Sequence, residues 1–94
     1  MEQTIRRKLI ELLQAEEMTA RDLSQTLSVM EKEIYRHLVH VEKTVRNQGL
    51  TLHITPCRCQ DCHYSFSDRS RLTKPGRCPR CKKSHIAAPR FSIR

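Results

Sequence analysis

The sequence has no tryptophan, only two glycines and no long hydrophobic run. Because a membrane-spanning helix needs roughly 20 consecutive apolar residues, we expect no membrane segment. With so few glycines, no glycine-rich loop that cradles phosphates is expected. Hydrophobic residues make up only 37% of the 94 residues, which is too little for a large core. We therefore expect a small cytoplasmic protein in which a metal or a disulfide stabilises whatever lies outside the main core.

Acidic residues are scarce in the second half of the chain. Residues 51–94 contain ten lysines and arginines but only two acidic residues, whereas residues 1–50 contain eight of each kind. The formal net charge of +8 therefore lies entirely in the second half. A change of composition this sharp predicts two functional parts, a neutral one followed by a strongly basic one.

The first half shows the apolar spacing of amphipathic helices. This spacing predicts a helix over residues 3–15, and Thr19 is a good N-cap for a short second helix that ends near Thr26. A third helix is expected from Glu31 to about Asn47, followed by Gly49 as its stop. Three helices of these lengths suggest a helix-turn-helix, although similar bundles also serve only as protein-contact modules. The buried stripe of the third helix is expected to consist of Ile34, Leu38, Val41 and Val45.

The face of the third helix opposite that stripe is largely basic. A rotation of about 100° per residue places its charged residues, together with Val39, on the solvent side. We expect this face to enter the major groove of DNA, where Arg36 can contact a guanine edge and Lys43 a phosphate. His37 and His40 are expected to be ordinary solvated helix residues. The candidate DNA contacts of this helix are Lys32, Tyr35, Arg36, His40 and Lys43.

After Gly49 the apolar residues alternate, which predicts a half-buried strand over residues 50–55. The other strand-like stretch is PRFSIR at residues 89–94, so we expect residues 50–55 and 90–94 to pair antiparallel as a β-wing. The expected fold is α+β: a winged helix-turn-helix domain of residues 1–56, whose second wing strand is 89–94, with residues 57–88 inserted at the wing tip. The alternative is two separate domains with a free C-terminal tail, or a tail that completes the sheet of the second domain.

Two cysteine pairs form the most specific motif in the sequence. Cys59 and Cys62 make one C-x2-C pair, Cys78 and Cys81 make another, and fifteen residues lie between the pairs. Four thiolates in two such turns are typical of a closed tetrahedral Zn²⁺ site, which is structural rather than catalytic. We therefore expect residues 57–88 to form a zinc ribbon that holds one zinc ion in each chain.

Cys57 is left over from this pairing, and we interpret it as a residue of the wing strand. One alternative is a second metal or redox site, formed by Cys57 with His53, His63 or His85, through which the protein would sense a signal. In another alternative, His85 takes the place of one zinc-binding cysteine.

The order of these parts resembles a family of small predicted prokaryotic transcriptional regulators in which a helix-turn-helix is fused to a zinc ribbon. The resemblance rests on TARDLSQTLSVMEKEIYRHLVHV, on the motifs CQDC and CPRC, and on the closing PRFSIR. It implies that Lys32, Tyr35 and Arg36 face DNA. The chain departs from the family pattern at Met30, where a Ser or Thr cap is more usual, and at His63, where many zinc ribbons have a glycine.

We expect a sequence-specific, double-stranded-DNA-binding transcriptional regulator and not an enzyme, because a zinc shell filled by sulfur leaves no position for a reactive water. The basic residues of the ribbon are expected to add phosphate contacts. RNA polymerase and a second copy of the chain are further candidate partners. The alternative is an adaptor that binds RNA, or the transcription or translation machinery, through the basic ribbon. The candidate DNA contacts of the ribbon are Arg80, Lys82 and Lys83.

Overall fold

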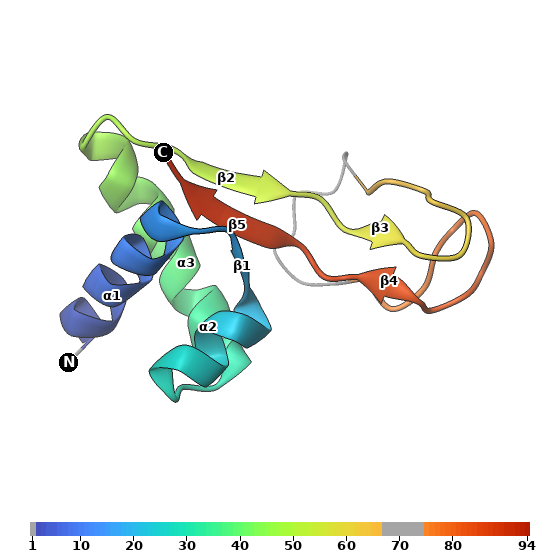
Figure 1. The fold of residues 1–94 in the computed structure, drawn as a ribbon, viewed down its shortest axis with the longest axis horizontal. Coiled ribbons are helices and arrows are strands. Elements are labelled where there is room, and N and C mark those ends of the chain that lie inside the picture. The colour runs from blue at the N-terminus through green and yellow to red at the C-terminus, as the bar shows by residue number, and fades with distance from the viewer. Residues whose placement is uncertain (1, 67–74) are drawn as a thin grey trace.

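The computed structural model describes residues 2–66 and 75–94. Three helices occupy the first half: α1 (Glu2–Ala15), α2 (Ala20–Leu27) and α3 (Glu31–Asn47) (Figure 1). Each begins and ends within about one residue of the helix that the apolar spacing predicts. The three predicted helices are therefore confirmed.

The starts of α2 and α3 are stabilised in different ways. The Thr19 hydroxyl accepts a hydrogen bond from the N–H of Asp22, and the Asp22 carboxylate accepts one from the N–H of Thr19, both at 3.1 Å. This reciprocal capping box fixes the start of α2. Met30 precedes α3 and gives no side-chain cap, but its carbonyl accepts hydrogen bonds from the N–H groups of Glu33 and Ile34. The helix nevertheless begins at Glu31, where the sequence predicts it.

Three short strands form one antiparallel sheet in the order β1-β5-β2. They are β1 (Met18–Thr19), β2 (Leu52–Thr55) and β5 (Arg90–Ile93). In β2 and β5, Leu52 lies opposite Ile93 and Thr55 lies opposite Arg90, which confirms the expected pairing of residues 50–55 with 90–94. The pairing of β1 with β5 was not predicted, because two residues are too few to show an alternating pattern.

The C-terminal strand contributes to the core of the helical half. Phe91 has no exposed surface and Ile93 is 2% exposed, and both belong to the cluster that contains the buried stripe of α3. Leu9 and Leu13 of α1 and Leu23 of α2 complete the centre of this cluster. The alternative of a free C-terminal tail is therefore wrong.

His37 differs from its predicted environment. It lies on α3 and is only 1% exposed, and its Nδ1 accepts a hydrogen bond from the Arg6 Nε of α1 at 3.3 Å. The expectation of a solvated His37 is wrong because α1 covers this flank of α3, a contact that the spacing within α3 does not reveal. His40, three residues later, is exposed as expected.

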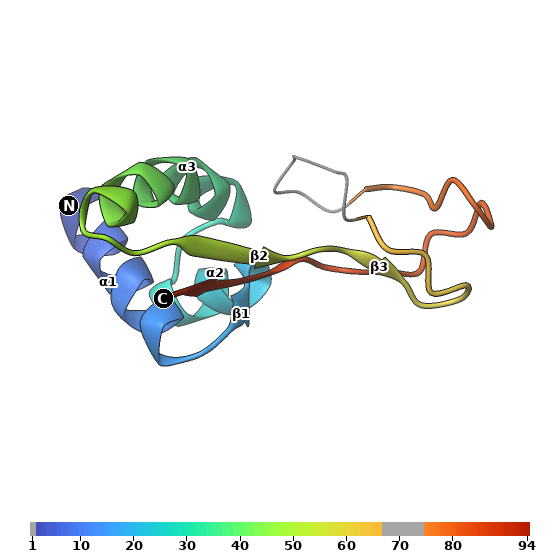
Figure 2. The ribbon, with the colours of Figure 1, turned by 90° about the horizontal axis from the view of Figure 1, so that it is seen from above.

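The segment between β2 and β5 extends away from the helices. Beyond the sheet the chain forms β3 (Arg58–Cys59) and β4 (Ile86–Ala87), which pair antiparallel. Figure 2 shows the paired strands running past the helices toward β3, so the cysteine-rich segment lies at the far end of the molecule. We call the described residues 57–66 and 75–88 the four-cysteine module. In the parts of the chain that the structure describes, none of the helices has both the length and the apolar character needed to cross a membrane.

Candidate metal centre and helix surface

The four cysteines of the two C-x2-C motifs come together at one point. Their Sγ atoms all lie within 4.8 Å of one another, with 3.5 Å between Cys59 and Cys81 and 3.6 Å between Cys62 and Cys78. None of the five cysteines forms a disulfide. With Zn–S bonds of about 2.3 Å, a tetrahedral site has sulfurs roughly 3.8 Å apart. The donor atoms and their spacing therefore suit one tetrahedral, thiolate-binding metal ion.

The two C-x2-C turns have the same backbone hydrogen bonds. In each turn, the N–H of the first cysteine donates to a carbonyl five residues later at 2.8 Å. The N–H that follows the second cysteine donates back to the first cysteine's carbonyl at 2.9 Å. The bonds are Cys59 N to Tyr64 O and His63 N to Cys59 O in the first turn, and Cys78 N to Lys83 O and Lys82 N to Cys78 O in the second. The two halves of the centre are thus built alike.

The residue after each turn has a left-handed backbone. His63 has a φ of 65° and Lys82 a φ of 67°, a region in which glycine is least strained. His63 thus adopts this conformation without being a glycine, and its φ matches that of Lys82 in the second turn. For residues with a Cβ this conformation costs on the order of 1 kcal/mol or more, which the hydrogen bonds of the turn offset.

The thiols of the cluster differ in acidity. The backbone N–H of Cys62 lowers the pKa of the Cys59 thiol to about 7. The N–H of Lys83 acts in the same direction on Cys81, but burial and the neighbouring thiols outweigh it and raise the pKa of Cys81 to about 12. One thiolate is thus favoured at the expense of another. A divalent cation removes this competition, because it stabilises all four sulfurs in the deprotonated form.

Cys57 lies outside the four-sulfur cluster. Among the described histidine, cysteine and acidic residues, the group close enough to share a metal ion consists of the four paired cysteines alone. Cys57 is 3% exposed and lies between β2 and β3, so its assignment to the wing strand is wrong. Pro56, which has no N–H to donate, separates it from the last residue of β2.

The histidines offered as alternative ligands also lie apart from the cluster. His53, His63 and His85 are all exposed. The Nδ1 of His85 lies 3.5 Å from Oδ2 of Asp61 rather than beside a cysteine. The structure therefore supports neither a site that joins Cys57 to a histidine nor the exchange of His85 for a cysteine ligand.

The candidate DNA contacts of α3 lie on its outer surface. Lys32, Arg36, His40 and Lys43 are exposed, whereas Tyr35 is partly buried against the core. Burial raises the pKa of Tyr35, and the nearby Glu31 and Cys57 act in the same direction. The Arg36 guanidinium contacts Glu33 at 2.6 Å, from Nη2 to Oε2. The other candidate contacts lie on the four-cysteine module and are exposed there: Arg80, Lys82 and Lys83.

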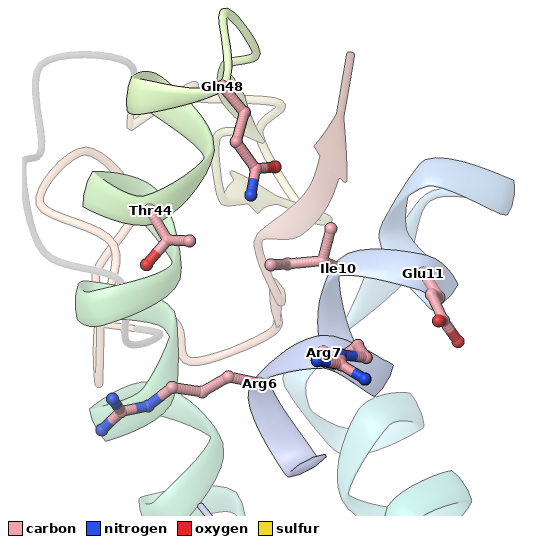
Figure 3. A pocket seen from close by; sticks show the side chains of 6 residues that line it. All are labelled: Arg6, Arg7, Ile10, Glu11, Thr44 and Gln48. Carbon is pink, nitrogen blue, oxygen red and sulfur yellow. The ribbon is translucent and has the colours of Figure 1, made fainter. Parts of the chain in front are cut away.

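Sequence reasoning did not single out the depression between α1 and α3 (Figure 3). Arg6 extends from α1 toward α3, where it reaches His37. Thr44 faces the depression from α3, and Gln48 does so from the residue that follows this helix. Among the residues that the structure describes, no histidine or cysteine lines this depression. The lining residues are Arg6, Arg7, Ile10, Glu11, Thr44 and Gln48.

Comparison with known proteins identifies relatives that share this architecture. The family model described as PF0610-like, N-terminal, matches residues 4–53, which is more than half of the chain. The chain is also similar to the solution NMR structure of protein PF0610 from Pyrococcus furiosus, with 30% sequence identity and a TM-score of 0.78. That match covers 97% of this chain and 89% of the other. No curated protein matches the sequence. On these two matches, the chain belongs to the PF0610-like family.

Proposed function

We propose that this protein is a winged helix-turn-helix regulator of transcription that binds double-stranded DNA in a sequence-specific manner and carries a structural zinc ribbon. The observation that carries the proposal is the division of α3 into two faces. Ile34, Leu38, Val41 and Val45 are fully buried on one face, and the cations of the other face are exposed. A helix anchored in this way and preceded by the short helix α2 suits insertion into a major groove.

The β2–β5 pair supports the proposal as a candidate wing. Its strand β2 is the first element after α3, and its strand β5 is anchored in the core through Phe91. The four-cysteine module continues from this pair (Figure 2), and its cations are exposed: Arg58, Arg77, Arg80, Lys82 and Lys83. A basic extension beside a groove-binding helix suits the phosphate backbone, where each contact releases counterions.

Zinc is the metal that we propose for the four-cysteine centre. Four cysteine sulfurs at these distances favour a soft tetrahedral ion and leave no position for a reactive water. When bound, the ion would offset part of the negative charge of the four thiolates and join the two C-x2-C turns. We therefore assign it a structural role, in line with a protein that binds rather than catalyses.

A second candidate function is an adaptor that binds RNA or single strands through the module. The observation that favours it is the pair of Tyr64 and Phe66, whose ring centroids lie 5.0 Å apart in an edge-to-face arrangement. Both rings are partly exposed and lie close in sequence to the basic Arg58. Aromatic rings beside cations can stack unpaired bases.

The test is a selection of duplexes from a randomised pool by the zinc-loaded protein, followed by fluorescence anisotropy on the recovered sequence. Arg36→Ala is expected to weaken binding to that duplex by about 1 to 3 kcal/mol and to relax the preference at one base pair. Arg46→Ala is the matched control, because Arg46 also lies on α3 and also contacts a glutamate about one turn earlier, Glu42 at 2.8 Å. Stronger binding to single strands or RNA than to any duplex would favour the adaptor.

A further inference from the structure

Val39 is an apolar residue in an otherwise basic stripe of α3. Lys32, Arg36, Val39 and Lys43 are spaced four, three and four residues apart, so they follow one another along a single face. All four are exposed, and Val39 is 50% exposed. Among the residues that the structure describes, the exposed large hydrophobic side chains are Met30, Val39 and Ile54, and Val39 alone of these lies within α3.

Neither helix formation nor packing accounts for a valine at this position. At exposed helical sites valine is less favourable than alanine by up to about 0.7 kcal/mol, since its branched side chain loses rotamers. The core contacts of α3 are made by the opposite face, and Val39 does not belong to the buried cluster. The exposed methyl groups are thus available to a ligand.

We propose that Val39 is a specificity-determining residue that contacts the C5 methyl group of a thymine in the major groove. This inference rests on the proposed function. The thymine methyl is the apolar group on the base edges of the major groove, and small apolar side chains recognise it by contact. A valine bordered by cations therefore matches a polyanion whose base edges carry methyl groups.

The charges around Val39 favour DNA over a second copy of the chain as the occupant of this surface. Arg36 and Lys43 border Val39 on either side along the stripe. A second copy presenting the same face would bring like charges together, and the chain as a whole has a formal charge of +8. Phosphates instead attract these cations, and the valine then faces the base edges between them.

The distance between Val39 and Arg36 predicts where the thymine lies. Three residues of helix advance about 4.5 Å, and successive base pairs are about 3.4 Å apart. The base pair contacted by Val39 is therefore expected to be the neighbour of the one read by Arg36. If Arg36 contacts a guanine, the preferred site contains a thymine in the adjacent base pair, on either strand.

The test replaces single thymines by deoxyuridine in the duplex recovered by selection with the zinc-loaded full chain. Deoxyuridine lacks only the C5 methyl, so one replacement beside the guanine is expected to weaken binding about fourfold, the effect of burying one methyl-sized group. Val39→Ala is expected to bind the thymine and deoxyuridine duplexes equally. Lys43→Ala is the control, because removing a phosphate contact weakens binding to both duplexes and keeps the fourfold ratio.

The outcomes separate this inference from the proposed function. Two outcomes overturn the role of Val39 and leave the proposed function standing. In the first, the protein binds one duplex selectively, but removing a thymine methyl never weakens binding. In the second, Val39→Ala keeps the same ratio of affinities for the thymine and deoxyuridine duplexes. If the protein binds no duplex selectively, both the role of Val39 and the proposed function are overturned. A Val39→Ala variant that changes the sedimentation of the protein but not the thymine ratio would assign Val39 to a protein interface instead.

Discussion

The hydroxyl of Thr55 donates a hydrogen bond to Oε2 of Glu17 at 2.6 Å, which joins the end of β2 to the segment between α1 and β1. Arg90 lies opposite Thr55 in the sheet, and its Nη1 lies 3.6 Å from Oε1 of the same carboxylate. Glu17 thus contacts both strands at the point where they leave the helices for the four-cysteine module. We call these three side chains the junction cluster.

Replacing Glu17 by Gln is expected to weaken the junction cluster with little effect on the rest of the protein. The cluster is exposed, so the loss of unfolding free energy should be about 1 kcal/mol or less. The larger effect is expected in local opening, measured as faster amide hydrogen exchange at the junction ends of β2 and β5. Glu16→Gln, an exposed neighbour with the same charge change, is the control. Equal exchange in the two variants would show that the cluster does not hold the strands.

Metal content should separate Cys57 from the four paired cysteines. Cys57→Ser is expected to keep one zinc per chain, because Cys57 lies outside the sulfur cluster. Cys59→Ser is expected to bind zinc far more weakly, since it removes one of four ligands. The measurement is the ratio of zinc to protein after dialysis against a weak chelator. The assignment of ligands fails if Cys57→Ser loses its zinc while Cys59→Ser retains it.

Phe91→Ala is expected to destabilise the helical half, even though residue 91 follows the four-cysteine module in sequence. A fully buried phenylalanine replaced by alanine costs about 3 to 5 kcal/mol, which is much of the stability of a small domain. Urea unfolding followed by helical circular dichroism measures the change. Arg94→Ala, an exposed substitution just after β5, is the control. Helices that unfold at the same urea concentration in both variants would contradict the role given to β5.

Local signals explain most of what the sequence predicts. The bounds of α2 follow from Thr19 and Asp22, whose capping pattern lies within four residues. The four-cysteine cluster was predictable because each C-x2-C turn sets the position of its two sulfurs through its own backbone, as the matching hydrogen bonds of Cys59 and Cys78 show. The pairing of β2 with β5 was predictable because the sequence offered two strand-like stretches.

The features that were missed depend on residues far apart in sequence. Met18 pairs with Phe91, a strand contact that no pattern within residues 16–20 indicates. The burial of His37 is set by α1, and the role of Glu17 by strands more than thirty residues later. For such contacts the sequence shows which residue stands at each position, but not which distant residue it contacts in the fold. Cys57 was assigned to the wing strand only because it was left over from the two cysteine pairs, and β2 ends before it, at Thr55.

The uneven charge of the chain leads to a prediction about salt. Residues 1–50 are formally neutral, so the helices supply little of the counterion release that drives binding to DNA. Neutralising Arg80, Lys82 and Lys83 together is therefore expected to weaken binding to all duplexes alike. The slope of log affinity against log salt should fall by about 0.9 for each phosphate that the protein no longer neutralises, and thus by up to roughly 3.

A variant with the same change in net charge tests whether position matters. Neutralising Arg7, Lys8 and Arg46 also removes three positive charges, but from α1 and the last turn of α3. We expect this control to change the salt slope much less, because direct contacts release more counterions than distant charges. Equal slopes in the two triple variants would mean that only net charge matters. The variant without the charges of Arg80, Lys82 and Lys83 could instead keep its zinc, its affinity for DNA and its salt slope. These three cations would then serve only to balance the thiolates, and a protein-docking role for the module would be favoured.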